Sequence, residues 1–436
     1  MAKIALIGAG SGFGGRLSVD ILSFPELRES TIALVDINRD AVDAVGGFVR
    51  KVIDAHGCGA KVVATTDRRE ALDGADYVVV AISVGGPAYD GVPYHYEIEI
   101  PAKFGVSQRV GDTVGPGGIF RTLRSAPEML AICADMQELC PDALLINYTN
   151  PMAMLTWIVN EGTTIRNVGL CHSVQGTAHQ LARYIGAQFS EMTYWVAGIN
   201  HMSWFLELKR NGEDAYPALW DALENPETFA KDTVRFEIMR HFGYFVTEST
   251  PHMSEYVPYF RKRPDLLEQY HLDYRSPSAE APQHRRWESE ERFGDEAARK
   301  AAQEGPSNEY ASRIIHSIET NTLYRFNGNV ANDGLIMNLE PGCCVEVPCM
   351  TDATGIRPCA IGELPPQLAG LNQSNVVVQR LVAEAVLERD LEKAFMATAL
   401  DPLTAAVCSL PEIRAMFDEM VAAEERWLAP HFGGGE

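Results

Sequence analysis

The sequence predicts an α/β protein, with an N-terminal Rossmann-like domain built on a doubly wound parallel sheet and a C-terminal mixed α/β (α+β) domain. Up to about residue 185, short runs of β-branched residues alternate with helical patterns, which is typical of successive βαβ units. The run at 77–82 is apolar throughout, as a strand must be when helices cover both faces of its sheet. A glycine-rich stretch directly follows the first expected strand, where Rossmann-like folds bind a dinucleotide.

The elements of the first half follow from these patterns. A helix is expected at 16–22, after the glycines, and a second one between residues 118 and 139, where apolar residues recur at helical spacing. Pro127 falls within the second helix and should kink it or begin a new segment there. The six strands expected are residues 3–8, 31–36, 61–64, 77–81, 143–147 and 167–170.

The pattern changes near Tyr194, beyond which aromatic residues, Met and Pro become frequent. Residues 376–387 predict a long helix, whereas the polar stretch 274–306 predicts a loop or short helices. A chain of 436 residues is long enough for about two to three domains. We therefore expect two domains, at residues 1–190 and 191–436.

Charge and composition exclude several classes of partner. The chain has 37 basic and 59 acidic residues, a formal net charge of −22, so it lacks the positive surface that nucleic acids and anionic membranes require. Its longest apolar run, 77–84, falls well short of the ~20 residues of a membrane-spanning helix. The N-terminal residues predict a strand rather than a signal peptide, and nine scattered cysteines indicate free thiols. We expect a cytoplasmic protein with no nucleic-acid partner and no membrane association.

The stretch GAGSGFGG at residues 8–15 predicts a dinucleotide-binding loop. Glycines between a strand and a helix let the chain turn tightly and let backbone N–H groups approach a pyrophosphate. When a GxGxxG motif is counted from Gly8, Phe13 stands at the third glycine position, and the register that starts at Gly10 begins late after the strand. The candidate cofactor-binding residues are Gly8, Gly10, Ser11, Gly12 and Asp36.

Asp36 ends the second expected strand, close to where Rossmann-like folds carry an acid for the ribose hydroxyls. A carboxylate at this place repels a 2′-phosphate, so it favours NAD over NADP. The alternative is that Asp36 or Asn38 only caps the helix that follows.

Four unusual polar segments follow the later strands, where open α/β sheets bind their ligands. Each has an ordinary alternative: a cysteine at a strand end is usually a small buried hydrophobe, and Asp112 in a Gly/Pro loop is usually a turn residue. Together, a thiolate, an imidazole and a carboxylate predict a divalent metal beside a nicotinamide, where it would polarise a substrate hydroxyl or ketone. Ligand softness alone favours zinc or iron over manganese at a cysteine. The segments are GDTVGPGG (111–118), NYTNP (147–151), CHS (171–173) and GINH (198–201).

These segments resemble the family-4 glycoside hydrolases, and the resemblance runs over nearly the whole chain. Within that family the chain is most similar to the α-galactosidases (melibiases), which act on unphosphorylated sugars. The Cys-His-Ser string at 171–173 agrees with this branch, since the phospho-glycosidases have Cys-Asn or Cys-Asp there. Further matching segments are AGINHM (197–202), GYFVTES (243–249) with EY (255–256), and NDGL (332–335) through GCCVEV (342–347).

The resemblance implies hydrolysis by oxidation, elimination and addition rather than by the usual pair of carboxylates. NAD⁺ oxidises C3 of the sugar, and Mn²⁺ stabilises the enediolate that forms when a base removes the C2 proton. The C1–O bond then breaks, water adds, and hydride returns to C3, which gives retention of configuration. By residue, the resemblance implies Cys171 and His201 as metal ligands, His172, Tyr256 and Asp112 as residues of the reaction, and Asn150 and Asp112 as substrate-binding residues.

In these implied roles His172 protonates the departing oxygen and Tyr256 takes the C2 proton, while Asp112 lies beside the metal and the base. Which of His172 and Asp112 is the acid stays open. Because a tyrosine ordinarily has a pKa of ~10, the site must lower the pKa of Tyr256 for this role. The alternative for Tyr256 is a core aromatic in the aromatic-rich stretch 256–260.

Three other functions remain open. The same mechanism can act on α-glucosides or α-uronides instead of α-galactosides. A conventional NAD-dependent 2-hydroxy-acid dehydrogenase shares the expected fold, but neither His172 nor His201 lies in the Gly-x-His-Gly-like turn of such enzymes. The third is a non-enzymatic NAD-binding sensor. The partner we expect is a small α-glycoside, bound by a homo-oligomer, either a dimer or a tetramer.

Overall fold

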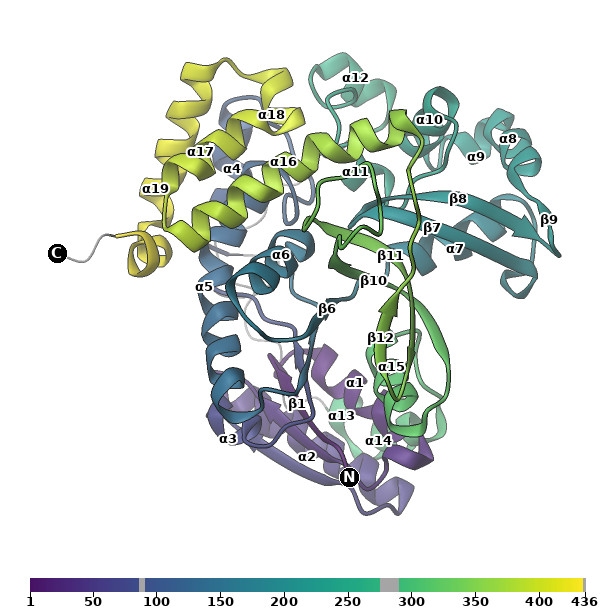
Figure 1. The fold of residues 1–436 in the computed structure, drawn as a ribbon, viewed down its shortest axis with the longest axis vertical. Helices are drawn as coiled ribbons and strands as arrows, with labels where there is room; N and C mark the ends of the chain where they lie inside the picture. The colour runs from purple at the N-terminus through teal and green to yellow at the C-terminus, as the bar shows by residue number, and fades with distance from the viewer. Residues whose placement is uncertain (86–90, 275–289, 434–436) are drawn as a thin grey trace.

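A mixed sheet of twelve strands runs through the described part of the computed structural model, which comprises residues 1–85, 91–274 and 290–433 (Figure 1). Its first half is parallel, with the strand order β3-β2-β1-β4-β5-β6, which is the doubly wound order of dinucleotide-binding folds. The predicted Rossmann-like sheet is confirmed, and each strand begins and ends within one residue of its predicted bounds. These strands are β1 (Lys3–Ile7), β2 (Thr31–Val35), β3 (Lys61–Thr65), β4 (Tyr77–Val80), β5 (Leu144–Asn147) and β6 (Asn167–Gly169).

The helices between these strands correct two of the predicted boundaries. Helix α1 begins at Gly12 rather than at residue 16, because the glycines themselves form its first turn. Helix α5 is continuous through Pro127, so no new segment begins there; burial against α4 and α6 offsets the backbone hydrogen bond that the proline lacks. The helices and 3-10 turns of this half are α1 (Gly12–Leu22), η1 (Pro25–Leu27), α2 (Arg39–His56), α3 (Arg68–Leu72), α4 (Tyr94–Lys103), α5 (Gly115–Leu139), α6 (Met152–Gly162), α7 (Ser173–Tyr184) and η2 (Phe189–Glu191).

The second half of the sheet is antiparallel, in the order β6-β10-β11-β7-β8-β9, with β12 paired to β11. The sheet is therefore continuous across residue 190, and both predicted domains contribute strands to it; the boundary between 1–190 and 191–436 stays a prediction. The predicted mixed α/β character of the second half is confirmed. Its strands are β7 (Met192–Ile199), β8 (Met202–Arg210), β9 (Glu213–Asp214), β10 (Tyr324–Ala331), β11 (Cys344–Asp352) and β12 (Gly355–Pro358).

The helices of the second half lie in separate groups (Figure 1). The predicted helix at 376–387 is part of the longer α16, which packs with α17 and α19 against helices of the first half. Among the described residues, no helix combines the length and the apolar character that crossing a membrane requires. The helices are α8 (Tyr216–Glu224), α9 (Pro226–Phe229), α10 (Thr233–Phe242), α11 (Thr250–Met253), α12 (Pro264–Gln269), α13 (Glu290–Phe293), α14 (Asp295–Gln303), α15 (Tyr310–Thr320), α16 (Pro366–Glu388), α17 (Leu391–Leu400), α18 (Pro402–Val407) and α19 (Leu410–Phe432).

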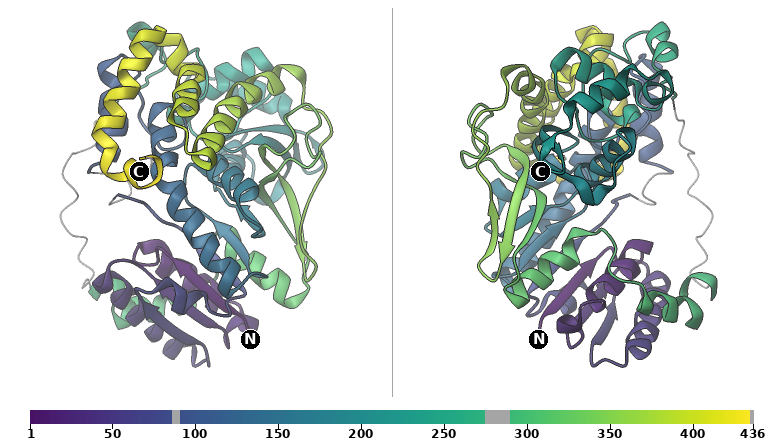
Figure 2. Two further views of the ribbon diagram at one scale, coloured as in Figure 1. Left: turned by 60° about the vertical axis from the view of Figure 1, so that its left-hand side comes forward. Right: turned by 90° about the vertical axis from the view of Figure 1, so that its right-hand side faces the viewer.

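Part of the polar stretch 274–306 folds back onto the N-terminal half, where α13 and α14 lie beside α1 and α2 (Figure 2). Lys51 of α2 pairs with Asp295 at 2.9 Å, and the buried Asp20 of α1 accepts a hydrogen bond from the Ser307 backbone N–H at 2.9 Å. The described part of this stretch agrees with the predicted short helices, while residues 275–289 lie outside the described residues.

Candidate active site

The loop between β1 and α1 has the glycine requirements of a dinucleotide-binding loop. Gly8 has a φ of +85°, and its backbone N–H donates to Val35 O of β2 at 2.9 Å. A Cβ on Gly10 would lie 2.6 Å from Asp36 Oδ2, which accepts a hydrogen bond from the Gly10 N–H at 2.8 Å. Ser11 Oγ donates to Gly8 O at 3.1 Å and closes the turn. The loop therefore delivers the chain into the N-terminus of α1, where backbone N–H groups can bind phosphate.

The third glycine of the motif is Gly14, one residue later than the register counted from Gly8 requires. A Cβ on Gly14 would lie 2.3 Å from Ala9 O and 2.6 Å from Ala9 Cα, so only glycine lets α1 approach the loop this closely. Gly12, the first residue of α1, has the guanidinium of Arg292 against it. A cation beside this loop suits a ligand that carries phosphates.

Asp36, the acid at the end of β2, does not cap α2. Asn38 caps α2, since its side-chain oxygen accepts a hydrogen bond from the Ala41 N–H at 3.1 Å. The Asp36 carboxylate instead accepts from the backbone N–H groups of Gly10 (2.8 Å) and Asn38 (2.9 Å). Asp36 thus joins the end of β2 to the glycine loop, the place from which we predict contact with a ribose.

Replacing Gly14 with alanine should destabilise the protein by about 1–3 kcal/mol, the usual cost of overpacking, and should weaken NAD⁺ binding at least tenfold. The physical reason is the contact with the Ala9 backbone, which cannot yield as a side chain can. Thermal unfolding and calorimetric titration with NAD⁺ measure the two effects. Gly47→Ala in α2 is the matched control: a Cβ there meets nothing within 4 Å, so this helical variant should be about 0.5–1 kcal/mol more stable. Unaltered NAD⁺ affinity in folded Gly14→Ala protein would contradict the assignment of this loop.

The structure brings together the two predicted metal ligands, which are 30 residues apart in sequence. Cys171 follows β6, and His201 lies in the turn between β7 and β8; Cys171 Sγ and His201 Nε2 are 3.1 Å apart. A carboxylate that the sequence analysis missed completes the cluster, with Glu248 Oε2 at 3.6 Å from His201 Nε2. One donor atom from each of the three residues lies within 4.8 Å of the other two. This combination of sulfur, nitrogen and oxygen donors fits a divalent cation.

Electrostatic coupling within this cluster is strong. Burial alone would lower the pKa of His201, but the adjacent Cys171 and Glu248 raise it to about 10. Burial alone would raise the pKa of Glu248, but His201 and His252 hold it well below its usual range. The cluster therefore keeps negative charge on Glu248 and attracts positive charge, which is the electrostatic requirement of a cation site.

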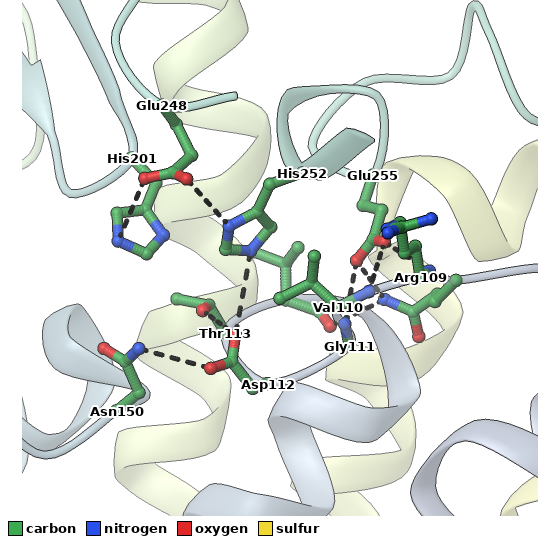
Figure 3. A network of polar contacts seen from close by, with 12 residues as sticks. Arg109, Val110, Gly111, Asp112, Thr113, Asn150, His201, Glu248, His252 and Glu255 are labelled. Carbon is green, nitrogen blue, oxygen red and sulfur yellow. Dashed lines mark hydrogen bonds and ion pairs between the residues drawn. The ribbon is translucent and has the colours of Figure 1, made fainter. Parts of the chain in front are cut away.

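Asp112 and Asn150 meet beside this cluster, as Figure 3 shows. Asp112 is buried in the loop before α5; its carboxylate accepts hydrogen bonds from Thr113 Oγ1 at 2.6 Å and from Asn150 Nδ2 at 3.4 Å. Burial acts to raise its pKa, but His252 and Arg121, each with a nitrogen at 3.8 Å, hold the pKa below its usual range. Asp112 is therefore a carboxylate at neutral pH.

His252 and Glu255 are two further residues for which no role was predicted, although Glu255 lies in a matching segment. The His252 ring lies between two acids, with Nδ1 at 3.6 Å from Glu248 Oε1 and Nε2 at 3.8 Å from Asp112 Oδ1. Figure 3 shows this arrangement. It also shows the Glu255 carboxylate, which accepts hydrogen bonds from the backbone N–H groups of residues 109, 110 and 111 at 2.7, 2.9 and 3.0 Å. A signal for His252 was available, because Glu248, His252 and Tyr256 recur every four residues.

Tyr256 is buried, 1% exposed, and its Oη has no hydrogen-bond partner among the described residues. Its ring centroid is 5.5 Å from that of His252 and 6.3 Å from that of His201. Burial, together with the negative charges of Glu248 and Asp112, raises the pKa of Tyr256 well above 10. The surroundings of Tyr256 within the protein therefore raise its pKa, whereas a catalytic base needs a lowered pKa. Positive charge bound in the site has to supply that lowering.

Helix α16 holds two of these segments in place from outside. Asn372 Nδ2 donates to Met202 O at 2.7 Å, next to His201, and Asn375 Nδ2 donates to Tyr256 O at 3.0 Å. Both asparagines are buried, so these hydrogen bonds fix the backbone that positions the His201 and Tyr256 side chains.

His172 has a different environment from the rest of the predicted site. Its side chain is 55% exposed, and its Nε2 lies 2.7 Å from Glu309 Oε1, in the segment that precedes α15. The hydrogen bond that His172 Nε2 donates to the Glu309 carboxylate raises the pKa of His172, against the opposing effect of partial burial. His172 therefore lies at the edge of the site in surroundings that favour its protonated form, and Glu309 is a further partner for which no role was predicted.

Two family models match the chain, one described as "Family 4 glycosyl hydrolase" over residues 3–187 and one as "Family 4 glycosyl hydrolase C-terminal domain" over residues 196–404. An α-galactosidase from Bacillus subtilis (strain 168) is 41% identical over 98% of this chain and 99% of its own length. An α-galactosidase from Rhizobium meliloti (strain 1021) is 39% identical over 98% of this chain and 89% of its own length.

Solved structures show the same fold. The putative glucosidase lplD from Bacillus subtilis is 25% identical and superposes with a TM-score of 0.78, covering 96% of this chain and 99% of that one. A 6-phospho-α-glucosidase from gut microorganisms, solved in complex with NAD and Mn²⁺, is 21% identical with a TM-score of 0.74, covering 97% and 98% of the two chains. The predicted fold class and the predicted family resemblance are thereby confirmed.

Proposed function

The chain belongs to the family 4 glycosyl hydrolases, and from this premise we propose that it is an α-galactosidase that uses NAD⁺ and a divalent metal, Mn²⁺, to hydrolyse small α-galactosides. The observation that carries the proposal is the meeting of Cys171, His201, Asp112 and Tyr256 in one buried cluster of a chain that also has a dinucleotide loop. The two α-galactosidases at about 40% identity support the choice of sugar.

The residues present fit both cofactors. Gly8, Gly10 and Gly14 allow the close backbone approach that a dinucleotide needs, and Cys171 with His201 would hold the metal. When bound, NAD⁺ supplies a hydride acceptor for C3 of the sugar, and the metal supplies a Lewis acid for the sugar oxygens, which together make the C2 hydrogen acidic.

In this proposal Tyr256 removes that C2 proton. Its Oη is buried and has no competing partner among the described residues, so the phenolate is free to accept a proton from the substrate. Asn150, whose amide points to Asp112, would bind a sugar hydroxyl and align it with this base. Tyr256 exchanges this proton with solvent, and a solvent-derived proton is returned to C2 when water adds at C1.

His172 is the proton donor to the departing glycosidic oxygen in this proposal. Asp112 is held as a carboxylate by His252 and Arg121, which keep its pKa low, so it has no proton to donate at neutral pH. The pKa of His172 is raised by Glu309, and its ring is open to a bound substrate. Asp112 instead balances the positive charge of the metal site and orients Asn150.

Hydrolysis of an aryl α-galactoside, with NAD⁺ and Mn²⁺ each supplied and each withheld under reducing conditions, tests the proposal. We expect turnover that requires both cofactors, no net NADH, and deuterium at C2 of the released galactose when the reaction runs in D₂O. Activity confined to an α-glucoside or an α-glucuronide would keep the mechanism and change the substrate. Net NADH with a 2-hydroxy acid would overturn the proposal in favour of a dehydrogenase.

A further inference from the structure

We propose that Glu248 is a third protein ligand of the catalytic metal, together with Cys171 and His201. The inference rests on the proposed metal-dependent function and adds to it a ligand from a different segment, the residues between α10 and α11. One Glu248 oxygen, Cys171 Sγ and a nitrogen of His201 lie within 4.8 Å of one another.

The spacing of the three donors fits a single ion. Metal–ligand bonds are about 2.3 Å for sulfur and about 2.0–2.2 Å for nitrogen and oxygen, so two ligands of one ion stand about 3–4.5 Å apart. Cys171 Sγ and His201 Nε2 are separated by 3.1 Å, and His201 Nε2 and Glu248 Oε2 by 3.6 Å. The third pair, Cys171 and Glu248, lies within the 4.8 Å that contains all three donors.

Among the described residues, no charged nitrogen lies closer than 3.6 Å to the Glu248 carboxylate and competes with a metal. Its two oxygens lie 3.6 Å from His201 Nε2 and 3.6 Å from His252 Nδ1, both longer than an ordinary hydrogen bond of about 2.7–3.2 Å. Figure 3 shows the carboxylate between the two rings, with one oxygen directed to each. One oxygen can therefore bind an ion beside His201 while the other keeps its contact with His252.

The backbone supports the same conclusion. His201 and Glu248 are non-glycine residues with positive φ, 62° and 77°. L-residues rarely adopt this conformation, and where they do it is often part of a functional site. Two of the three donors are thus held in strained turns on separate segments. This conformation of the two turns directs the side chains of His201 and Glu248 toward the same proposed metal position.

A carboxylate ligand also answers the question of metal choice. A thiolate and an imidazole alone form a soft site that favours zinc, whereas an oxygen ligand moves the preference toward manganese. Bound to the ion as a thiolate and a carboxylate, Cys171 and Glu248 would place two negative charges beside a divalent cation.

The variant Glu248→Gln tests this ligand, since it keeps the side-chain shape and removes the charge. Titration with Mn²⁺ can be followed by the electron paramagnetic resonance signal of free Mn²⁺. The dissociation constant of the Glu248→Gln protein should be at least tenfold higher than that of the wild type. Glu237→Gln is the matched control: Glu237 also pairs with a histidine, His241 at 3.1 Å, but on the surface of α10. The control should bind Mn²⁺ as the wild type does.

A spectroscopic measurement separates a ligand from a residue that only positions His201 and His252. At saturating Co²⁺, loss of a carboxylate ligand should shift the visible d–d bands of the Glu248→Gln protein, whereas a positioning residue would leave the bands of the saturated site unchanged. Unchanged bands, or unchanged Mn²⁺ affinity, would overturn the assignment of Glu248 and leave the proposed function intact. Failure of the wild type to bind Mn²⁺ at all would overturn the metal-dependent function itself.

Discussion

Replacing Tyr256 with phenylalanine should lower the rate of α-galactoside hydrolysis by about 10²–10⁴-fold, the usual effect of losing a general base, and leave the folded protein intact. The Tyr256 Oη is buried without a hydrogen-bond partner among the described residues, so its removal breaks no bond of that part of the structure. An unpaired buried hydroxyl costs about 1–3 kcal/mol on mutational scales, and the variant should therefore be as stable as the wild type or more stable.

This prediction distinguishes a base from a core aromatic, because both roles predict a stable variant and only the first predicts an inactive one. The measurements are kcat, incorporation of deuterium at C2 in D₂O, the thermal unfolding midpoint, and the affinities for NAD⁺ and Mn²⁺. Tyr216→Phe gives the opposite control: Tyr216 Oη donates to Phe205 O and accepts from the Phe245 N–H at 3.1 Å. That variant should lose stability and retain activity. Near-normal turnover by the Tyr256→Phe protein would refute the base assignment.

The parallel half of the fold could be predicted strand by strand because its signal is local. A strand covered by helices on both faces must be apolar along its whole length, so runs such as Tyr77–Val80 mark their own ends within one residue. Helix starts are less well marked. The glycines at the start of α1 are poor helix formers, and they take helical geometry here because Gly14 packs against the Ala9 backbone while Gly10, in the preceding loop, packs against Asp36. The local sequence does not reveal these contacts.

The candidate site shows the same contrast between local and distant information. Cys171, His201 and Asp112 could be proposed because each lies in an unusual segment at a strand end or a turn, and the structure brings them together. Glu248 lies in the matching segment 243–249, but no role was predicted for it, and His252 lies outside the matching segments; only the tertiary fold places their side chains between His201 and Asp112. The four-residue spacing of Glu248, His252 and Tyr256 was visible in the sequence. A short spacing alone, however, does not show which residues of other segments these side chains contact.

Replacing Cys171 with serine should raise the Mn²⁺ concentration for half-maximal activity at least tenfold, with NAD⁺ affinity unchanged. A cysteine thiol releases its proton when it binds a metal, whereas a serine hydroxyl keeps its proton at neutral pH, so the variant loses an anionic ligand 3.1 Å from His201 Nε2. Activity assays over a range of Mn²⁺ concentrations measure the change. Cys58→Ser is the control, since Cys58 is also half-buried but follows α2, far along the chain from these segments.

The identity of the metal sharpens this test. Sulfur is a soft ligand that zinc prefers more strongly than manganese does, so the loss of affinity in the Cys171→Ser protein should be greater for Zn²⁺ than for Mn²⁺. Equal losses would indicate that the side chain acts on the site through charge or packing rather than through a metal–sulfur bond. An unchanged Mn²⁺ requirement would remove Cys171 from the ligand set and leave His201 and Glu248, whose nitrogen and oxygen are 3.6 Å apart, as the protein donors.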